Sequence, residues 1–402
     1  MLTLEDIQQA RERIRPYIYL SPLSHSQTLS KITGKELYLK LENLQMTGSF
    51  KDRGALNRML QLKEEDKARG VVASSAGNHA QAVAYLAQRL GIEATIVMPE
   101  NAPLTKVSNT RHHGADVVLC GETYQEAYDR AAQIQKERGA VFIHPFDDEQ
   151  VIAGQGTIAL ELLEQQPELE AVVVPVGGGG LISGVALGLK ALKPNMKIIG
   201  VEAEAFPSAR LSLERDAIVA QSGGASLADG IAVKEIGQKT FEIMREHVDQ
   251  MVSVGEEDIA RAILTLLELE KTVAEGAGAV ALAAMLEGKV WMRERKVAVL
   301  VSGGNIDVNK LSRIIEHGLA KDGRRIRLKV RVSDRPGALL AVTALIAEEK
   351  ANVVEVYHER SFPDGPVDTT EVLFTLETRG REHAEAVMAR LERDGFYPEE
   401  QR

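Results

Sequence analysis

Cysteine is almost absent from this chain, and positively charged residues are in deficit. Cys120 is the one cysteine among 402 residues, which excludes a disulfide within the chain and a metal site built from several cysteines. Acidic residues outnumber basic ones by 58 to 48, so the net charge near neutral pH is −10. A charge of this sign disfavours nucleic acid as a partner.

A targeting segment and an unbroken membrane span are missing as well. Residues 1–6 have neither the basic start nor the apolar centre of a signal peptide, so we expect a cytoplasmic protein. Residues 171–189 carry no charge and are long enough to cross a bilayer. Pro175 and four consecutive glycines interrupt this run, and its Val-rich start favours a strand. We therefore expect no membrane span.

The pattern of apolar runs predicts an α/β fold. With 402 residues, 44% of them apolar, the chain can form two or three domains with a large core. Short Val- and Ile-rich runs alternate with helical stretches, which is typical of an open, mostly parallel sheet with helices on both faces. The predicted strands are residues 94–98, 116–119, 141–143, 171–176, 197–201 and 296–301.

A lysine stands at the start of a predicted helix. Ser49 is a suitable N-cap and Asp52 completes a capping pattern, so Lys51 falls in the first turn. The positive end of the helix dipole disfavours an ammonium there and lowers the pKa of the amine. A neutral amine can condense with an aldehyde, as Schiff-base lysines do. The alternative interpretation is an ordinary surface lysine beside a helix cap.

Two further segments supply partners for such a lysine. Four glycines, 177–180, lie between a predicted strand and a predicted helix, where converging backbone N–H groups bind phosphate. Ser302 follows the strand at 296–301, at the carboxyl end where open α/β sheets bind ligands. Together these features indicate pyridoxal 5′-phosphate, with the lysine on its aldehyde, the glycines on its phosphate and Ser302 on its ring nitrogen.

Five sequence motifs occur along the chain in the same order as in a known enzyme family. They are Lys-Leu-Glu-Asn-Leu-Gln at 40–45, Gly-Ser-Phe-Lys-Asp-Arg-Gly at 48–54, Ser-Ser-Ala-Gly-Asn-His-Ala-Gln at 74–81, the glycines at 177–180 and Ser-Gly-Gly-Asn at 302–305. On these motifs residues 7–319 resemble the fold-type II pyridoxal-phosphate enzymes, a group that includes tryptophan synthase β and serine racemase. Within this group the chain looks most like the threonine dehydratases.

The resemblance assigns roles to individual residues. It implies that Lys51 binds the cofactor covalently and later takes the Cα proton, and that Ser75 helps to hold the substrate. The expected cofactor-binding residues are Phe50, Lys51, Asn78, Gly177, Gly178, Gly179, Gly180, Leu181 and Ser302. The expected substrate-binding residues are Ser75, Ala76, Gly77, Asn78 and His79. The alternative interpretation of the second set is a plain turn between a strand and a helix.

The implied reaction is β-elimination from an amino acid. L-Threonine, and also L-serine, would lose ammonia to give 2-oxobutanoate or pyruvate, as the first step towards isoleucine. Ser302 favours elimination over transamination, because a neutral hydroxyl does not hold the ring nitrogen protonated. A serine or threonine racemase of the same fold is an alternative, but racemases of the group carry a serine where Ala76 stands here.

Two interpretations from other classes remain open. A nicotinamide-dependent oxidoreductase would use the glycine-rich turn, with Glu202 as the ribose-binding acid, although the G-x-G-x-x-G pattern fails. A catalytically idle amino-acid sensor is the second, against which the intact Lys51, Asn78 and Ser302 argue. Some relatives hold a metal near the position of Glu202, but Ser208 stands here in place of a second carboxylate. We therefore expect no metal, with a monovalent cation at this position as the alternative.

The pattern changes near residue 320. Residues 326–332, 352–359, 369–376 and a short segment from 396 read as strands, and 338–349 and 382–393 as helices. The order β-α-β-β-α-β is ferredoxin-like and resembles an ACT domain, an amino-acid sensing module. We expect a catalytic domain at 1–320, with a small lobe at 44–142, a linker at 321–325 and an ACT domain at 326–402.

The ACT resemblance also implies partners. Paired ACT domains would bind an amino-acid effector between them, so we expect a homodimer or homotetramer. The expected effector residues are Asp334, Pro336, Gly337 and Asn352. A purely structural dimerisation domain is the alternative.

Overall fold

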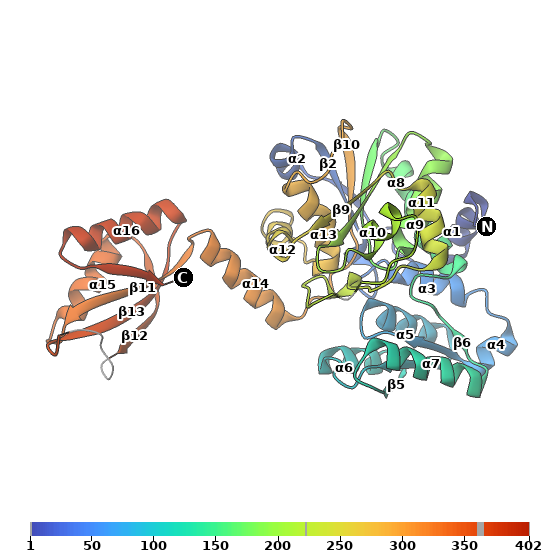
Figure 1. The fold of residues 1–402 in the computed structure, drawn as a ribbon, viewed down its shortest axis with the longest axis horizontal. Helices are drawn as coiled ribbons and strands as arrows, with labels where there is room; N and C mark the ends of the chain where they lie inside the picture. Colours follow the sequence, from blue (N-terminus) through green and yellow to red (C-terminus); the bar gives the residue numbers. More distant parts are fainter. Residues whose placement is uncertain (1, 222, 360–365, 402) are drawn as a thin grey trace. The chain divides into compact units, whose positions relative to one another are not determined.

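The computed structural model describes residues 2–221, 223–359 and 366–401. The chain divides into two compact units, Met1–Ile306 and Asp307–Arg402. Figure 1 shows that both units combine strands with helices. Within the described ranges no helix is long and apolar enough to cross a membrane.

The first unit is built around a six-stranded sheet in the order β1-β2-β10-β7-β8-β9. Strand β1 is antiparallel to β2, and the other neighbours are parallel. Every residue of β7 is buried, as expected for a parallel strand covered on both faces. The strands are β1 (Leu23–His25), β2 (Glu36–Leu41), β7 (Ala171–Pro175), β8 (Lys197–Ala203), β9 (Gln250–Val254) and β10 (Lys296–Val301).

Helices pack against this sheet. Residues of α8, α9 and α11 form one apolar cluster with residues of β7, β8 and β10, and α13 contacts the same three strands. The helices are α1 (Leu4–Ile14), α2 (Gln27–Thr33), α8 (Glu149–Gln165), α9 (Gly180–Leu192), α10 (Ser208–Glu214), α11 (Gln238–His247), α12 (Glu256–Glu270) and α13 (Gly276–Leu286), with short 3-10 helices η1 (Glu42–Leu44) and η2 (Asp229–Ile231).

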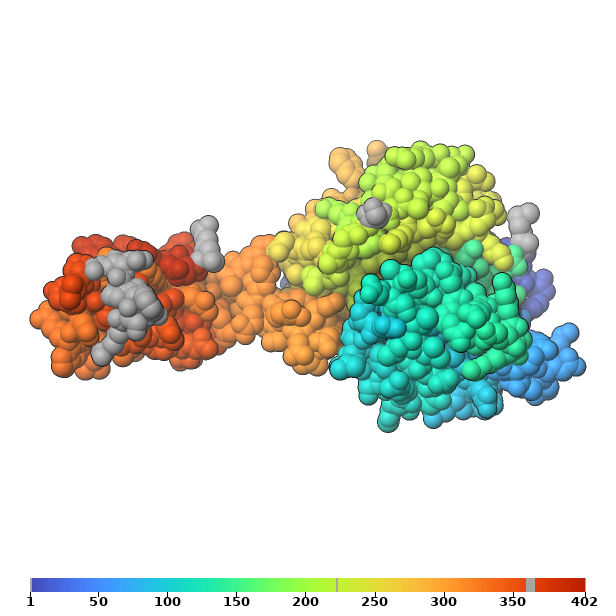
Figure 2. Space-filling model, turned by 60° about the horizontal axis from the view of Figure 1, so that its bottom comes forward, coloured from blue at the N-terminus to red at the C-terminus, as the bar shows by residue number. Residues whose placement is uncertain are grey.

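A smaller parallel sheet, in the order β5-β4-β3-β6, lies within the predicted small-lobe range. Figure 2 shows this lobe in blue-green beside the yellow-green surface of the large lobe, and Lys106 and Asp229 form an ion pair of 2.9 Å between them. Its elements are α3 (Lys51–Met59), α4 (Glu64–Arg69), β3 (Val71–Ser74), α5 (Asn78–Leu90), β4 (Ala94–Met98), α6 (Leu104–His112), β5 (Asp116–Leu119), α7 (Tyr124–Arg138) and β6 (Val141–Phe142). The predicted α/β class and parallel strands are confirmed.

The predicted cap of the lysine helix is wrong. Helix α3 does begin at Lys51, but its N-cap is Phe50 and no side chain caps it. The carboxylate of Asp52 instead accepts a hydrogen bond from the backbone N–H of Thr47 at 3.0 Å. Ser49 is held by a backbone bridge to Gly303. A tertiary strand-like contact therefore fixes the start of this helix, and a local capping box does not.

A buried cluster of charges holds α3 in place. Arg53 is fully buried, and its guanidinium donates to both oxygens of Glu42 at 2.8 Å and to Glu161 at 2.6 Å. Lys40 donates to Glu161 at 2.6 Å and to the carbonyl of Ser21 at 2.7 Å. The cluster joins α3 to β2, η1 and α8. Buried charges are tolerated in this way only when each has its partners.

We expect the loss of one member to destabilise the first unit. Arg53→Ala removes the partner of two buried carboxylates and should lower the free energy of unfolding by about 3–5 kcal/mol, measured by denaturant unfolding. Lys67→Ala is the matched control, because Lys67 pairs with Glu64 at the surface with 32% and 87% of the side chains exposed. That change should cost less than about 1 kcal/mol. Equal losses would contradict a stabilising role of the buried cluster.

After its first helix, α14, the second unit has the predicted β-α-β-β-α-β order. Its antiparallel sheet has the order β12-β13-β11-β14, and apolar residues of this sheet pack against α15 and α16. The last strand begins at residue 398, two residues later than expected, and Phe396 packs against the core instead. The elements are α14 (Val308–Lys321), β11 (Arg325–Ser333), α15 (Ala338–Glu348), β12 (Asn352–Glu359), β13 (Thr369–Glu377), α16 (Arg381–Arg393) and β14 (Pro398–Gln401).

Candidate active site

The amine of Lys51 is part-buried in the first unit. Its Nζ donates a hydrogen bond to the carbonyl of Pro145 at 2.8 Å and lies 5.1 Å from the centre of the Phe50 ring. Burial lowers the pKa of Lys51 from 10.5 to about 8, and the carboxylate of Glu275 raises it by a smaller amount. The direction agrees with the sequence-based expectation, but the main cause is desolvation.

The glycine loop passes the same segment of chain. Phe146 follows Pro145, and a Cβ added to Gly178 would lie 2.3–2.4 Å from carbons of its ring. A Cβ on Gly180 would meet the backbone of Phe146 at 2.9 Å, and Gly179 has a left-handed φ of +94°. No other residue type fits this close approach. Because Gly180 begins α9, the loop presents backbone N–H groups at a helix N-terminus, the usual setting for an anion.

The substrate loop predicted at 75–79 joins β3 to α5. The helix begins at Asn78. The hydroxyl of Ser75 accepts a hydrogen bond from the N–H of Gly77 at 3.1 Å. The His79 ring is buried and bonds to the carbonyl of Ile143 at 2.8 Å. Burial, followed by the charge of Lys51, lowers the pKa of His79 to about 3, so this ring is neutral.

Asn78 and Ser302 lie at the ends of elements that meet near Lys51. The carbonyl of Ser302 accepts from the N–H of Phe50 at 3.1 Å, which ties the end of β10 to the start of α3. The Ser302 hydroxyl is buried and has one long hydrogen bond, 3.4 Å, to the carbonyl of Ala277. The amide of Asn78 donates to Glu275 at 2.5 Å. These contacts bring Phe50, Lys51, Asn78 and Ser302 together.

Sequence reasoning missed Glu275 as part of this group. Its signal in the sequence is slight: it directly precedes the small-residue run Gly-Ala-Gly-Ala at 276–279. Its place next to Asn78 comes from packing, because the N–H of Glu275 donates to the carbonyl of Gly303 at 3.1 Å.

The residues present fit pyridoxal 5′-phosphate. They offer an amine that is easily neutralised for the aldehyde, backbone N–H groups for the phosphate and a buried hydroxyl at a strand end for the ring nitrogen. In the described part of the chain, the buried hydroxyl of Ser49 also has no hydrogen-bond partner. Ser49 stands two residues before Lys51, so its hydroxyl is available for a hydrogen bond to a ligand.

Glu202 has a structural role at the start of α10. Its carboxylate is buried and accepts from the N–H groups of Ala209 and Arg210 at 3.0 and 3.2 Å, in the first turn of α10. Burial raises the pKa of Glu202 to about 7. The carboxylate therefore caps a helix, which does not suit the ribose contact considered for a nicotinamide enzyme. Among the described residues, no group of three His, Cys, Asp or Glu side chains could hold a metal ion.

The predicted effector residues do not meet within one second unit. Asn352 begins β12, pairs with Glu377 and donates to its carboxylate at 3.0 Å. Glu377 in turn pairs with Arg325, the first residue of β11. The turn with Asp334, Pro336 and Gly337 follows the opposite end of β11, eight residues or about 26 Å away at 3.3 Å per residue. A pocket that contains all four residues would need a second copy of the chain.

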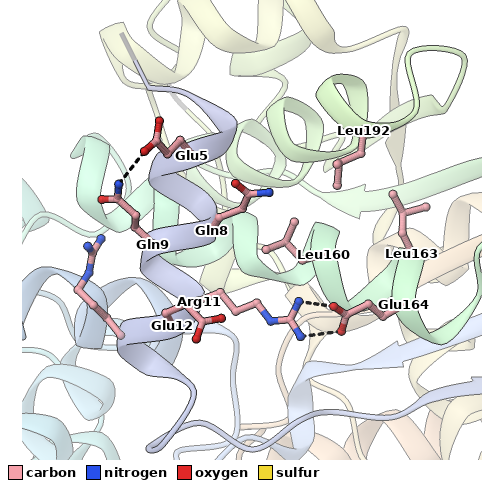
Figure 3. A pocket seen from close by; sticks show the side chains of 10 residues that line it. Glu5, Gln8, Gln9, Arg11, Glu12, Leu160, Leu163, Glu164 and Leu192 are labelled. Carbon is pink, nitrogen blue, oxygen red and sulfur yellow. Dashed lines mark hydrogen bonds and ion pairs between the residues drawn. The ribbon is translucent and has the colours of Figure 1, made fainter.

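A hollow elsewhere on the first unit contains none of the predicted site residues. It lies between α1, α8 and α9 and has a volume of about 930 Å³. Figure 3 shows the side chains that line it. Leu160, Leu163 and Leu192 form its apolar part. Arg11 crosses it to reach both carboxylate oxygens of Glu164.

Comparison with known proteins defines the class of protein. A family model described as "Pyridoxal-phosphate dependent enzyme" matches residues 14–303, and one described as "ACT domain" matches residues 322–394. The chain therefore belongs to the pyridoxal-phosphate dependent enzymes and carries a C-terminal ACT domain. This membership decides for pyridoxal phosphate, and against a nicotinamide, as the cofactor.

Individual relatives narrow the class further. The chain is 52% identical over 387 residues to the L-threonine ammonia-lyase of Thermotoga maritima, with 96% of each chain covered. Its fold is similar to that of a serine racemase from maize, with a TM-score of 0.75, 37% identity and coverage of 80% of this chain and 98% of that one. The processed form of threonine deaminase isoform 2 from Solanum lycopersicum has a TM-score of 0.74 and 41% identity, over 78% of this chain and 86% of that one.

The lowered pKa of Lys51 predicts selective amine reactivity. In cofactor-free protein, we expect its modification by an amine-reactive reagent to rise through pH 8, because deprotonation exposes the nucleophilic amine there. Peptide mapping by mass spectrometry across pH 6–11 would measure this. Lys296, whose pKa is raised by its hydrogen bond to Glu168, is the internal control and should react only at higher pH. Parallel profiles for the two lysines would contradict the prediction.

Proposed function

We propose that this chain is an L-threonine ammonia-lyase that also accepts L-serine. It would release 2-oxobutanoate or pyruvate together with ammonia. The observation that carries the proposal is the amine of Lys51, held on the carbonyl of Pro145 next to the glycine loop, with a pKa near 8. The relative from Thermotoga maritima, which carries the name L-threonine ammonia-lyase, supports the choice of substrate.

The cofactor would be bound by groups from both lobes of the first unit. The N–H groups of Gly177, Gly178, Gly179, Gly180 and Leu181 would hold its phosphate. Phe50 would line the ring, Asn78 would donate to the ring oxygen and Ser302 would meet the ring nitrogen. When bound, pyridoxal phosphate supplies an electron sink for charge that develops at the substrate α-carbon.

Lys51 would act as the general base. With substrate bound, the neutral Nζ of Lys51 would accept the Cα proton. A pKa near 8 keeps a usable fraction of this amine neutral at physiological pH. The neutral His79 ring would not compete for that proton, because its pKa is near 3.

The segment 75–79 would hold the substrate carboxylate. Ser75, Ala76, Gly77, Asn78 and His79 run into the N-terminus of α5. The first N–H groups of a helix have no partner within it, and they attract an anion. The Ser75 hydroxyl would complete this set. A carboxylate fixed there would position the substrate for Lys51.

Racemisation is the second candidate, because a serine racemase is among the similar structures. Return of a proton to the opposite face of the α-carbon needs a donor on that face. Ala76, which the resemblance places there, has no exchangeable proton. Elimination is therefore favoured.

The function is tested by release of keto acid. We expect purified protein to convert both L-threonine and L-serine, with formation of D-amino acid below the rate of elimination. Selectivity between the two should be modest, because one methyl group is worth about 1–3 kcal/mol in an apolar pocket. Lys51→Ala should abolish both turnover and the yellow colour of the bound cofactor, whereas the surface change Lys67→Ala should keep both. Turnover retained in Lys51→Ala would contradict the mechanism.

We expect Ser302 to influence the choice between elimination and transamination. Ser302→Asp places a carboxylate at the proposed ring-nitrogen position and should raise abortive transamination relative to elimination, because it stabilises a protonated ring. The ratio is measured as pyridoxamine phosphate formed per keto acid released. Ser302→Ala, which adds no charge, should keep the ratio low. An unchanged ratio in Ser302→Asp would discard this role.

Regulation through the second unit is part of the proposal. We expect an amino acid such as isoleucine to bind between paired ACT domains, near Asp334, Pro336, Gly337 and Asn352, in a homodimer or homotetramer. Asn352 and the turn that carries the other three residues lie towards opposite ends of β11, which supports a site shared by two copies. The keto-acid assay with added isoleucine would test it. The domain limits 1–320, 321–325 and 326–402 and the cytoplasmic location stay predictions.

A further inference from the structure

A buried carboxylate that no proposed step uses lies beside the site. Glu275 is 5% exposed, and its Oε1 accepts the hydrogen bond from Asn78 Nδ2 at 2.5 Å. Its charge also acts on Lys51, since it raises the pKa of that amine against the larger effect of burial. A carboxylate is seldom this deeply buried without a structural or functional partner.

Backbone contacts fix the position of this carboxylate. The N–H of Glu275 donates to the carbonyl of Gly303 at 3.1 Å, and a Cβ added to Gly278 would lie 2.2 Å from the same carbonyl. A Cβ added to Gly303 would lie 2.4 Å from Glu275 Oε1 and 3.1 Å from Asn78 Nδ2. The contact between Glu275 and Asn78 therefore lies directly against the residue that follows Ser302. Glu275 also stands at the N-terminus of α13, where a negative charge is favoured.

The hydrogen bond between Asn78 and Glu275 is one end of a series of hydrogen bonds that continues through Asn305 to Thr47. Asn305 Nδ2 donates to the carbonyl of Thr47 at 2.6 Å and to Asn78 Oδ1 at 2.9 Å. An ionised carboxylate and a carbonyl can only accept, so the two ends of the series set the orientation of both amides. Asn305 Nδ2 has two hydrogens, and these two contacts use them. Asn78 Nδ2 donates one of its two hydrogens to Glu275. Its second hydrogen takes no part in this series of hydrogen bonds.

We propose that Glu275 and Asn305 are positioning residues that hold the Asn78 amide in the orientation that leaves one N–H for the ring oxygen of the cofactor. The inference rests on the proposed role of Asn78 at that oxygen. In the opposite orientation the amide would turn its oxygen towards the carboxylate of Glu275 and towards the ring oxygen, so that acceptors would face acceptors. Under this proposal, Glu275 and Asn305 act on the cofactor through Asn78, to which both are hydrogen-bonded.

The test is binding of pyridoxal phosphate to cofactor-free protein, followed by absorbance. Glu275→Ala removes the acceptor that orients the amide and should weaken binding by about tenfold, the worth of one hydrogen bond to a charged group, with a shift of the absorbance band of the bound cofactor. Glu275→Gln keeps an acceptor oxygen and should recover most of the affinity. An equal loss in both variants would show that the charge matters and the orientation does not, and it would overturn the proposal.

A double-mutant cycle separates action through Asn78 from direct action. In an Asn78→Ala background, Glu275→Ala should change the affinity by less than about twofold, because the amide to be positioned is gone. A full tenfold effect in that background would overturn the proposal. If Glu275→Ala does not fold, Asn305→Ala carries the same cycle, with the same two outcomes.

The matched control lies on the same helix. Glu287 is the C-cap residue of α13 and bonds to Arg261 at 2.8 Å on the surface. Glu287→Ala should leave the affinity for pyridoxal phosphate within about twofold of the unchanged protein. Failure of the unchanged protein to bind the cofactor would overturn the proposed function together with this inference. Binding that Glu275→Ala leaves untouched would overturn the inference alone.

Discussion

The backbone contact between the end of β10 and the start of α3 is the constraint on which the site depends. Ser49 forms a bridge with Gly303, the N–H of Phe50 donates to the carbonyl of Ser302, and the N–H of Gly304 donates to the carbonyl of Gly48 at 2.9 Å. The contact joins two segments about 250 residues apart in the sequence. It places the serine at the end of the strand next to the residues that lead into the lysine helix, so that one small ligand can meet both.

Burial then gives the lysine its chemistry. The segment that follows Ile143 contacts both the amine and the glycine loop: the carbonyl of Pro145 accepts the hydrogen bond of the amine, and Phe146 packs on the glycines. Desolvation makes the charged form of Lys51 costly, and the nearby Glu275 offsets only part of this cost. The cluster around Arg53, two residues further along α3, shows the opposite solution: there every buried charge has a partner within hydrogen-bond distance.

Several features could be predicted from the sequence, and others could not, for physical reasons. Parallel strands buried on both faces need continuous apolar runs, so 94–98 and 296–301 could be assigned without a structure. The capping pattern of Ser49 and Asp52 gave a wrong prediction of the helix cap. A tertiary backbone contact holds the start of the helix in place of a local capping box. Glu275 was missed because its partner Asn78 lies 197 residues away, a separation that leaves no local pattern.

The sequence by itself determined the class of chemistry and the order of the elements, because glycines, a lysine and a serine stand at turns whose positions follow from local periodicity. It also determined the βαββαβ order of the second unit. Only the tertiary structure decided why the lysine is deprotonated easily, which carboxylate contacts Asn78, and that Asn352 and the turn with Asp334 lie towards opposite ends of β11. These properties depend on distances and solvent exclusion between segments remote in the chain, which no local pattern of residues encodes.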